Sequence, residues 1–282
     1  MITALQEQLA IPRDLAAAMA RQALSIQGAG YYITNTGRRV DISIAMSTAV
    51  QGTVTYPPEM SLPISAAGYF NTAVEIANAT TLAAASSLID RGFHPVVLNM
   101  ASAISPGGGF LGGARAQEEY LARSSTLYTC LKGNLMYSAD FSHNPFYADY
   151  VIYSPEVVIF RDDDGELLEK PYLCSIVTSP AVNAAAVHRY MPHRTGEIEN
   201  AMWNRILKLF SVSLLHGHKA LVLGAWGCGA FGNDGYMVAS LFRTALTENF
   251  QGAFERVAFA IADWSPEQDF IGPFLKTFSQ PS

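Results

Sequence analysis

Apolar residues follow two spacings along this chain, and from about residue 66 onward the two spacings alternate. Short apolar runs are typical of strands covered on both faces of a sheet, whereas apolar positions three and four residues apart are typical of helices. The predicted strands are 72–76, 95–100, 151–161, 172–179, 219–225 and 255–262. The predicted helices are 79–90, 114–131, 196–216 and 233–249. This order predicts a three-layer α/β/α domain with a mixed sheet over residues 66–282.

The first 65 residues have a different pattern. A helix is predicted to begin with Pro12 in its first turn, to carry apolar residues at helical spacing from Leu15 to Ile26, and to end at residues 28–30. Residues 31–42 predict a β-hairpin, and the proline-bearing stretch 53–63 predicts a connector. We interpret residues 1–65 as an accessory α+β segment packed on the core.

The composition agrees with a folded α/β protein. Of the 282 residues, 50% are hydrophobic and 15% are charged, which provides enough apolar material for a large core. The formal net charge of −6 argues against a strongly basic nucleic-acid surface, so no direct DNA binding is expected.

The cysteines and residues 1–8 give an expectation for the cellular compartment of the protein. Cys130, Cys174 and Cys228 are odd in number and widely spaced, which argues against a disulfide framework and a zinc site and favours a reducing compartment. Residues 1–8 lack a basic segment followed by an apolar one, and no apolar run is long enough to span a membrane. The chain is therefore expected to be cytoplasmic and without a membrane partner.

Two glycine-rich loops each follow a predicted strand and precede a predicted helix. The first covers residues 105–113 and the second covers residues 226–233. Backbone N–H groups at such a junction, together with the positive end of the helix dipole, suit a phosphate. The alternative is that the glycines only permit tight turns, but two loops of this density at one sheet edge favour a ligand such as a diphosphate.

The second loop also matches the dinucleotide-binding pattern G-x-G-x-x-G through Gly227, Gly229 and Gly232. That fingerprint requires an acidic residue about 20 positions later, at the end of the next strand. The corresponding acid, Asp263, lies well beyond that spacing, so a nicotinamide-dependent dehydrogenase is disfavoured. A P-loop is excluded because neither loop is followed by Gly-Lys-Ser/Thr.

Glu118 and Glu119 follow the first loop at the start of a predicted helix. Adjacent helical side chains point about 100° apart, so the two carboxyl groups have different roles. A carboxyl group that retains its proton beside a sugar can assist glycosidic bond cleavage. The structural alternative is a pair of acids favoured by the helix dipole, with Glu119 forming a surface ion pair with Arg123.

Other polar clusters are weaker candidates. The histidines at 188, 193, 216 and 218 are interpreted as solvated loop or turn residues. The acidic stretch 162–165 predicts a turn, since it lacks the spacing and the final glutamate of an EF-hand. Cys228 is interpreted as a small loop residue, because no base partner for a nucleophile is assignable.

The stretch Pro106–Leu111 with Ala116–Glu119 resembles the GGG-spacer-QEE signature of poly(ADP-ribose) glycohydrolases. The compact spacing and the downstream stretch 221–233 are similar to the bacterial branch of that family, and the resemblance runs from about residue 10 to the final strand. Ser105 departs from the pattern, since many relatives have asparagine there. The resemblance implies a macrodomain-like fold around ADP-ribose.

The resemblance also implies roles for individual residues. Glu119 would be the catalytic acid on the ribose–ribose O-glycosidic bond, and Glu118 would hold the ribose hydroxyls. The implied substrate-binding residues are Asn99, Gly107, Gly108, Gly109, Phe110, Gln117, Gly227, Cys228, Gly229, Ala230, Phe231 and Gly232. Asn78 and Thr80 are candidates for the adenine end.

The implied reaction uses neither metal nor cofactor and releases ADP-ribose from poly(ADP-ribose). The implied partners are poly(ADP-ribose) and ADP-ribosylated proteins. Two alternatives remain open from the sequence. A non-enzymatic ADP-ribose reader would keep the loops and lose the acid, whereas Glu118 and Glu119 are both present. A hydrolase of single ADP-ribose units on proteins would differ only in the linkage that it cleaves.

Overall fold

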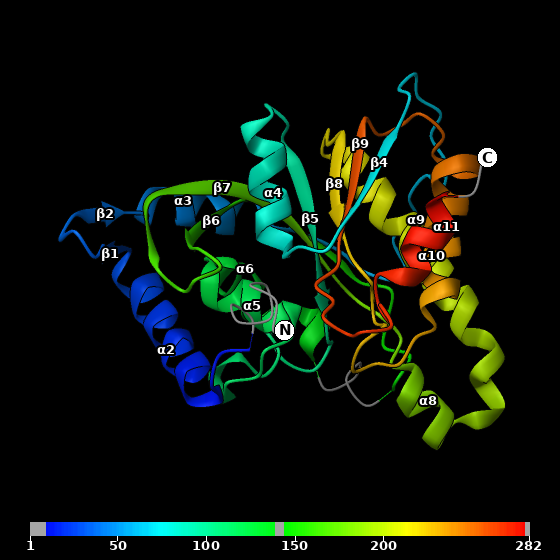
Figure 1. The fold of residues 1–282 in the computed structure, drawn as a ribbon, viewed down its shortest axis with the longest axis horizontal. Helices are drawn as coiled ribbons and strands as arrows, with labels where there is room; N and C mark the ends of the chain where they lie inside the picture. Colours follow the sequence, from blue (N-terminus) through cyan, green and yellow to red (C-terminus); the bar gives the residue numbers. More distant parts are fainter. Residues whose placement is uncertain (1–9, 139–143, 280–282) are drawn as a thin grey trace.

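The computed structural model describes residues 10–138 and 144–279, and within them a seven-stranded mixed sheet forms the centre of the molecule (Figure 1). Its strands are β3 (Val54–Tyr56), β4 (Ala73–Ala77), β5 (Pro95–Ala101), β6 (Val151–Arg161), β7 (Leu167–Pro180), β8 (Ala220–Leu223) and β9 (Arg256–Ala260). The order across the sheet is β3-β6-β7-β5-β8-β9-β4. The strands from β7 to β4 run parallel, while β6 pairs antiparallel with both β7 and β3.

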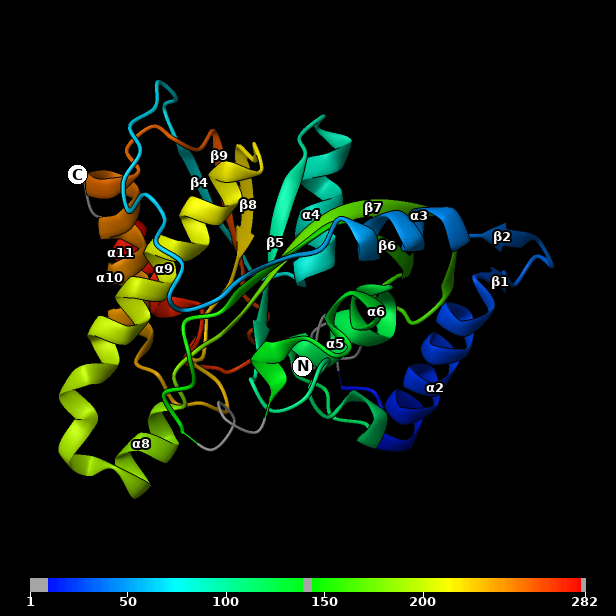
Figure 2. The ribbon, with the colours of Figure 1, turned by 180° about the vertical axis from the view of Figure 1, so that it is seen from behind.

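Helices cover both faces of this sheet (Figures 1 and 2). Successive strand residues point to opposite faces, so Val96 and Leu98 of β5 join one buried cluster and Val97 joins another. The first cluster packs under α8 (Ala184–Tyr190), α9 (Ile198–Leu215), α10 (Gly235–Thr244) and α11 (Gly272–Ser279). The second packs under α3 (Ser43–Gln51), α4 (Thr81–Asp90), α5 (Gln117–Ser124) and α6 (Leu127–Leu131). The predicted three-layer α/β/α fold is confirmed.

The N-terminal segment packs against the β6 side of the sheet. Helix α2 (Arg13–Ala29) and the hairpin of β1 (Tyr31–Ile33) and β2 (Arg39–Asp41) form as predicted. A third buried cluster joins Ile26 and Tyr32 to Phe160 of β6. The predicted connector over 53–63 contains β3, so this segment also supplies an edge strand of the main sheet. A boundary between two units near residue 65 stays a prediction.

Several predicted elements differ from the observed ones. The helix expected over 114–131 is interrupted at Ser125, whose extended backbone (φ −146°, ψ 177°) forms a bridge to Ile159. The interruption leaves α5 as a short helix whose first turn lies at the sheet edge. The helix expected over 233–249 is α10 followed by a π-helical turn, η4 (Ala245–Asn249). Strand β7 begins at Leu167, because it forms a long hairpin with β6 around the predicted turn 162–165.

Short helices were the elements that the sequence pattern did not predict. Helices α3, α8 and α11 are seven to nine residues long, and helices of that length depend on packing for stability. The histidines at 188 and 193, interpreted as loop residues, lie in α8 and in the 3-10 helix η3 (Pro192–Glu197). Two more 3-10 helices are η1 (Phe110–Gly112) and η2 (Leu135–Tyr137).

Over the residues that the structure describes, no helix has both the length and the apolar character needed to cross a membrane. The predicted lack of a secretory signal concerns residues 1–8, which lie outside the described residues.

Candidate active site

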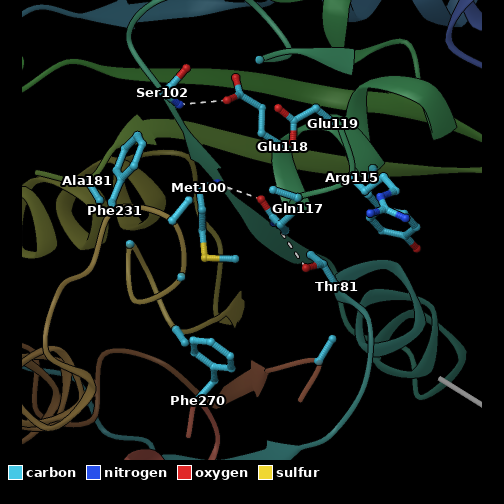
Figure 3. Close-up of a pocket in the computed structure, with 18 of the residues that line it drawn as sticks. Thr81, Met100, Ser102, Arg115, Gln117, Glu118, Glu119, Ala181, Phe231 and Phe270 are labelled. Carbon is cyan, nitrogen blue, oxygen red and sulfur yellow. Dashed lines mark hydrogen bonds between the residues drawn. The ribbon is translucent and has the colours of Figure 1, made fainter. Parts of the chain in front are cut away.

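A cavity of about 680 Å³ lies at the carboxyl ends of the five parallel strands (Figure 3). In open α/β sheets this edge is where ligands bind. The lining residues are Ala79, Thr80, Thr81, Met100, Ser102, Ile104, Ser105, Gly108, Gly109, Arg115, Ala116, Gln117, Glu118, Glu119, Tyr120, Ala181, Ala225, Gly227, Gly229, Ala230, Phe231, Ala260, Ile261, Ala262, Trp264 and Phe270.

The first turn of α5 is fixed to the central strand by Gln117. The Gln117 Oε1 atom accepts the Met100 N–H at 2.9 Å, and its Nε2 group donates to the Leu98 carbonyl at 2.7 Å. The same Nε2 group donates to Thr81 Oγ1 at 3.3 Å (Figure 3). One amide side chain therefore ties α5 to β5 and to the start of α4, and the two glutamates that follow it are held at the cavity wall.

Glu118 and Glu119 are each anchored by one carboxyl oxygen. Glu118 Oε2 accepts the Ser102 N–H at 2.8 Å, and Glu119 Oε1 accepts the Gly109 N–H at 2.9 Å. The other oxygens, Glu118 Oε1 and Glu119 Oε2, are buried and have no hydrogen-bond partner within the described chain. Buried polar atoms are rarely left without a partner, so these two atoms mark where a ligand's hydroxyl groups would be bound.

Gly108 lies directly against both carboxyl groups. Its φ is +60°, and a Cβ atom there would lie 2.3 Å from Glu119 Oε1 and 3.1 Å from Glu118 Oε2. Only glycine provides both this left-handed backbone and this close approach. The triple-glycine loop therefore has a second role besides offering backbone to a ligand, since it leaves room for the acidic pair.

Burial raises the pKa of Glu118 to about 8, against the lowering effect of the Ser102 N–H, and the charge of Glu119 adds to the rise. The Glu118 carboxyl group therefore retains its proton at neutral pH, which is the state that a general acid requires.

This raised pKa predicts a pH-dependent effect on stability. A carboxyl group whose pKa rises on folding stabilises the protein fully below its unfolded pKa, and that stabilisation is lost as the pH rises through the folded value of about 8. Glu118→Gln cannot ionise, so we expect its melting temperature to exceed that of the wild type near pH 9 and the difference to shrink toward pH 5. Thermal unfolding across this range measures the effect, and a constant difference would contradict it.

The second glycine loop presents free backbone donors to the cavity. The N–H groups of Gly229, Ala230 and Phe231 donate no hydrogen bond within the described residues, and all three residues line the cavity. Gly227 has a φ of +76°, and a Cβ atom there would lie 2.4 Å from Asn233 Nδ2. Asn233 closes the loop by donating to the Gly227 carbonyl at 3.1 Å. Consecutive free N–H groups of this kind form a concave site for an anion such as a phosphate.

The structure brings most of the predicted site residues to the cavity. Its lining contains Gly108, Gly109, Gln117, Glu118, Glu119, Gly227, Gly229, Ala230 and Phe231. The lining does not include Asn99, Gly107, Phe110, Cys228 or Gly232. Asn99 is fully buried and donates to Thr178 Oγ1 at 3.1 Å, and Phe110 packs against Tyr128 in a small core cluster. Asn99 therefore joins β5 to β7, and Phe110 packs the first glycine loop against α2 and α5.

The segment after β9 supplies lining residues that the sequence analysis did not identify. Trp264 and Phe270 stand on this segment, and Phe270 lies across Met100 from the glutamates in Figure 3. The Asp263 carboxylate folds the segment by accepting the N–H groups of Phe270 and Ile271 at 2.8 and 2.9 Å. The rule that ligands bind at the carboxyl ends of strands also applies to the last strand, and that signal could have pointed to them.

Arg115 is a further lining residue that was missed. It lies two positions before Gln117, between the first glycine loop and α5, and its Nη1 group donates to the Ile11 carbonyl at 2.9 Å. A cation beside the cavity complements the anionic ligand that the two loops predict.

Asn78 and Thr80, the candidates for the adenine end, have different positions. The Asn78 side chain exchanges hydrogen bonds with the backbone of Asp263 and is not part of the lining. Thr80 lines the cavity, and its hydroxyl caps α4 by accepting the Ala83 N–H at 3.0 Å.

Three other chemistries find little support at this site. The Asp263 carboxylate is occupied by backbone N–H groups, so it cannot serve the ribose of a dinucleotide. Burial raises the pKa of the Cys228 thiol to about 12, which disfavours a nucleophilic thiolate. In the described part of the chain, no three His, Cys, Asp or Glu side chains come together as metal ligands. A metal-free reaction stays a prediction.

A family model for the catalytic domain of microbial-type poly(ADP-ribose) glycohydrolase matches residues 20–162. That range includes the first glycine loop, both glutamates and the β6 strand, while the second loop lies beyond it. Among curated proteins, none matches the chain.

Solved structures are similar over nearly the whole chain. Poly(ADP-ribose) glycohydrolase from Thermomonospora curvata is 40% identical, with a TM-score of 0.87, over 94% of this chain and 100% of that one. The same enzyme bound to the inhibitor ADP-HPD is 40% identical, with a TM-score of 0.86, over 93% and 99%. Poly(ADP-ribose) glycohydrolase from Deinococcus radiodurans in complex with ADP-ribose is 40% identical, with a TM-score of 0.78, over 83% and 97%.

Proposed function

The chain belongs to the microbial-type poly(ADP-ribose) glycohydrolase family, whose members are glycosidases, and from that premise we propose how its cavity binds and cleaves poly(ADP-ribose). The cavity takes the terminal ADP-ribose unit of the polymer, and the bond cleaved is the ribose–ribose O-glycosidic bond. The observation that carries this proposal is the pair of buried carboxyl oxygens, one each on Glu118 and Glu119, that have no partner within the described residues.

The two loops and the acidic pair bind different parts of the ligand. The free N–H groups of Gly229, Ala230 and Phe231 hold the diphosphate. Glu118 Oε1 accepts hydroxyl groups of the terminal ribose, and its anchor on Ser102 fixes the direction of that contact. The relatives solved with ADP-ribose and with ADP-HPD support a ligand of this class for the cavity.

Glu119 acts as the acid. It transfers its proton to the oxygen that leaves with the next polymer unit while the bond between that oxygen and the ribose C1 breaks. Positive charge develops on the sugar, and the nearby diphosphate stabilises it. Water then forms the new bond to C1 and returns a proton to Glu119, so the carboxyl group is regenerated and free ADP-ribose is released.

The experiment that tests this function compares two substrates without added metal. One is a protein carrying poly(ADP-ribose), the other carries single ADP-ribose units, and released ADP-ribose is measured by chromatography. We expect release from the polymer and little from the single units. Release from the single units alone would make the chain a mono-ADP-ribosyl hydrolase. Binding of ADP-ribose without any release would make it a reader.

The partners and the cellular location follow from the same proposal. ADP-ribosylated proteins are the macromolecules that bring the polymer to the cavity. The thiols of Cys130, Cys174 and Cys228 are all unpaired, which supports a reducing cytoplasm as the location. Fractionation of cells that express the chain tests this placement, and recovery of the chain outside the cytoplasm would contradict it.

A further inference from the structure

The turn at the tip of the β6–β7 hairpin reaches the wall of the cavity. Its residue Asp163 accepts two hydrogen bonds, one at each carboxyl oxygen. Thr80 Oγ1 donates to Asp163 Oδ2 at 2.6 Å, and the Tyr120 phenol donates a short hydrogen bond to Asp163 Oδ1. Thr80 and Tyr120 line the cavity, whereas Asp163 does not. The acidic turn 162–165, which has no role in the proposed function, is thus hydrogen-bonded to two residues that line the cavity.

Tyr120 completes the anchoring of the first turn of α5. The three residues before it are each held by a separate partner: Gln117 by β5, Glu118 by Ser102 and Glu119 by Gly109. Tyr120 is held by Asp163. Gln117 and Tyr120 are three positions apart, so they share one face of the helix and meet the neighbouring Thr81 and Thr80.

Tyr120 remains a hydrogen-bond donor throughout the accessible pH range. Its side chain is buried, and both this burial and the neighbouring Asp163 charge raise its pKa well above the usual range. A buried phenol bonded to a carboxylate is a strong and directional contact. Loss of this hydrogen bond would release the Tyr120 ring and leave Asp163 Oδ1 without its donor.

The β6–β7 hairpin that carries Asp163 is held near its tip, on its β7 strand and within its turn. Thr36, in the β1–β2 turn, donates from Oγ1 to Glu169 Oε1 at 2.8 Å, and the Tyr32 phenol donates to the Leu168 carbonyl at 2.7 Å. Within the turn, Arg161 Nη1 donates to the Gly165 carbonyl at 3.0 Å. The N-terminal hairpin therefore supports the β6–β7 hairpin, whose tip in turn contacts α5.

We infer that Asp163 is a positioning residue for hydrolysis, which acts through Tyr120 and Thr80 to hold the first turn of α5 and the carboxyl groups of Glu118 and Glu119. This inference rests on the proposed function. It also gives the N-terminal segment a part in the reaction, because the hairpin β1–β2 contacts the start of β7, next to the turn from which Asp163 extends.

A double-mutant cycle on poly(ADP-ribose) hydrolysis tests the inference. Asp163→Asn replaces one of the two acceptor oxygens by an NH2 group, which cannot accept a hydrogen bond from the hydroxyl that faces it. Tyr120→Phe removes only the phenol oxygen. We expect each to lower kcat on the order of tenfold, with KM changed less than about threefold, since a small displacement of a catalytic group costs rate. Because both variants break the same hydrogen bond, the kcat of the double variant should fall no further than that of the more impaired single variant. The matched control is Asp164→Asn, which removes the same charge from an exposed residue in the same turn.

Several outcomes separate a positioning role from a structural one. Losses that multiply in the double variant, or a kcat of Asp163→Asn equal to that of Asp164→Asn, would overturn the inference. A lower melting temperature with unchanged kcat would also overturn it. If Asp163→Asn does not fold, Tyr120→Phe alone decides the question. It removes the hydrogen bond through which Asp163 acts, so a normal kcat in that variant would overturn the inference. Absence of hydrolysis by the wild type would instead reject the proposed function.

Discussion

Glu119→Gln is expected to lower kcat for release of ADP-ribose from poly(ADP-ribose) by at least about 10³-fold, while the Kd for ADP-ribose changes less than about tenfold. Glutamine has the size of glutamate, and its Oε1 atom can still accept the Gly109 N–H, which Glu119 accepts at 2.9 Å. Its amide has no acidic proton to give to the leaving oxygen. Steady-state kinetics and calorimetry of ADP-ribose binding measure the two quantities separately.

A control for this variant is Glu199→Gln, the same chemical change on the exposed surface of α9. It should leave kcat and Kd unchanged. If Glu119→Gln retained more than about a tenth of the wild-type kcat, Glu119 could not be the acid. Loss of ADP-ribose binding together with a large fall in melting temperature would identify Glu119 as a structural residue.

Gly108→Ala is expected to lower kcat/KM by about 10²-fold or more, because the new methyl group would occupy the place of the acidic pair. The Cβ atom would lie 2.3 Å from Glu119 Oε1, so that carboxyl group must move away from Gly109. The left-handed backbone at Gly108 adds a strain of roughly 1–2 kcal/mol for alanine. Kinetics on poly(ADP-ribose) and thermal unfolding measure the two effects.

The same loop contains a matched control. Gly112 lacks the left-handed backbone, and a Cβ atom built on it meets no atom of the described residues within 4 Å. Gly112→Ala should therefore keep nearly all of the activity. Equal activities of the Gly108 and Gly112 variants would show that close approach to the carboxyl groups is not what requires glycine at position 108.

The pattern from β5 through the glycines to Glu119 was sufficient to predict that the first glycine loop and the two glutamates lie together at the sheet edge, because its parts are local. A strand, a loop that tolerates left-handed backbone and the first turn of a helix are adjacent in sequence, so their order fixes their arrangement. The contact between Gly108 and the carboxyl groups was not predictable in this way. It depends on the loop turning back onto α5, which the spacing of residues alone does not specify.

Contacts between distant segments account for most of what the sequence did not reveal. Asp163 was recognised only as part of an acidic turn, because its partners Thr80 and Tyr120 lie in other elements of the fold. Trp264 and Phe270 were missed for a similar reason, since the segment that bears them is folded by Asp263 rather than by a helix or strand pattern. The division of helix 114–131 at Ser125 depends on a bridge to β6, which again is non-local.

The measurement that tests the central claim most directly is a crystal structure of the Glu119→Gln variant with ADP-ribose. The account predicts the diphosphate against the N–H groups of residues 229–231, and the C1 hydroxyl of the terminal ribose within hydrogen-bonding distance of the side chain at position 119. It also predicts a ribose hydroxyl on Glu118 Oε1. A ligand bound outside this cavity, or bound inside it with the C1 hydroxyl directed away from position 119, would contradict the account.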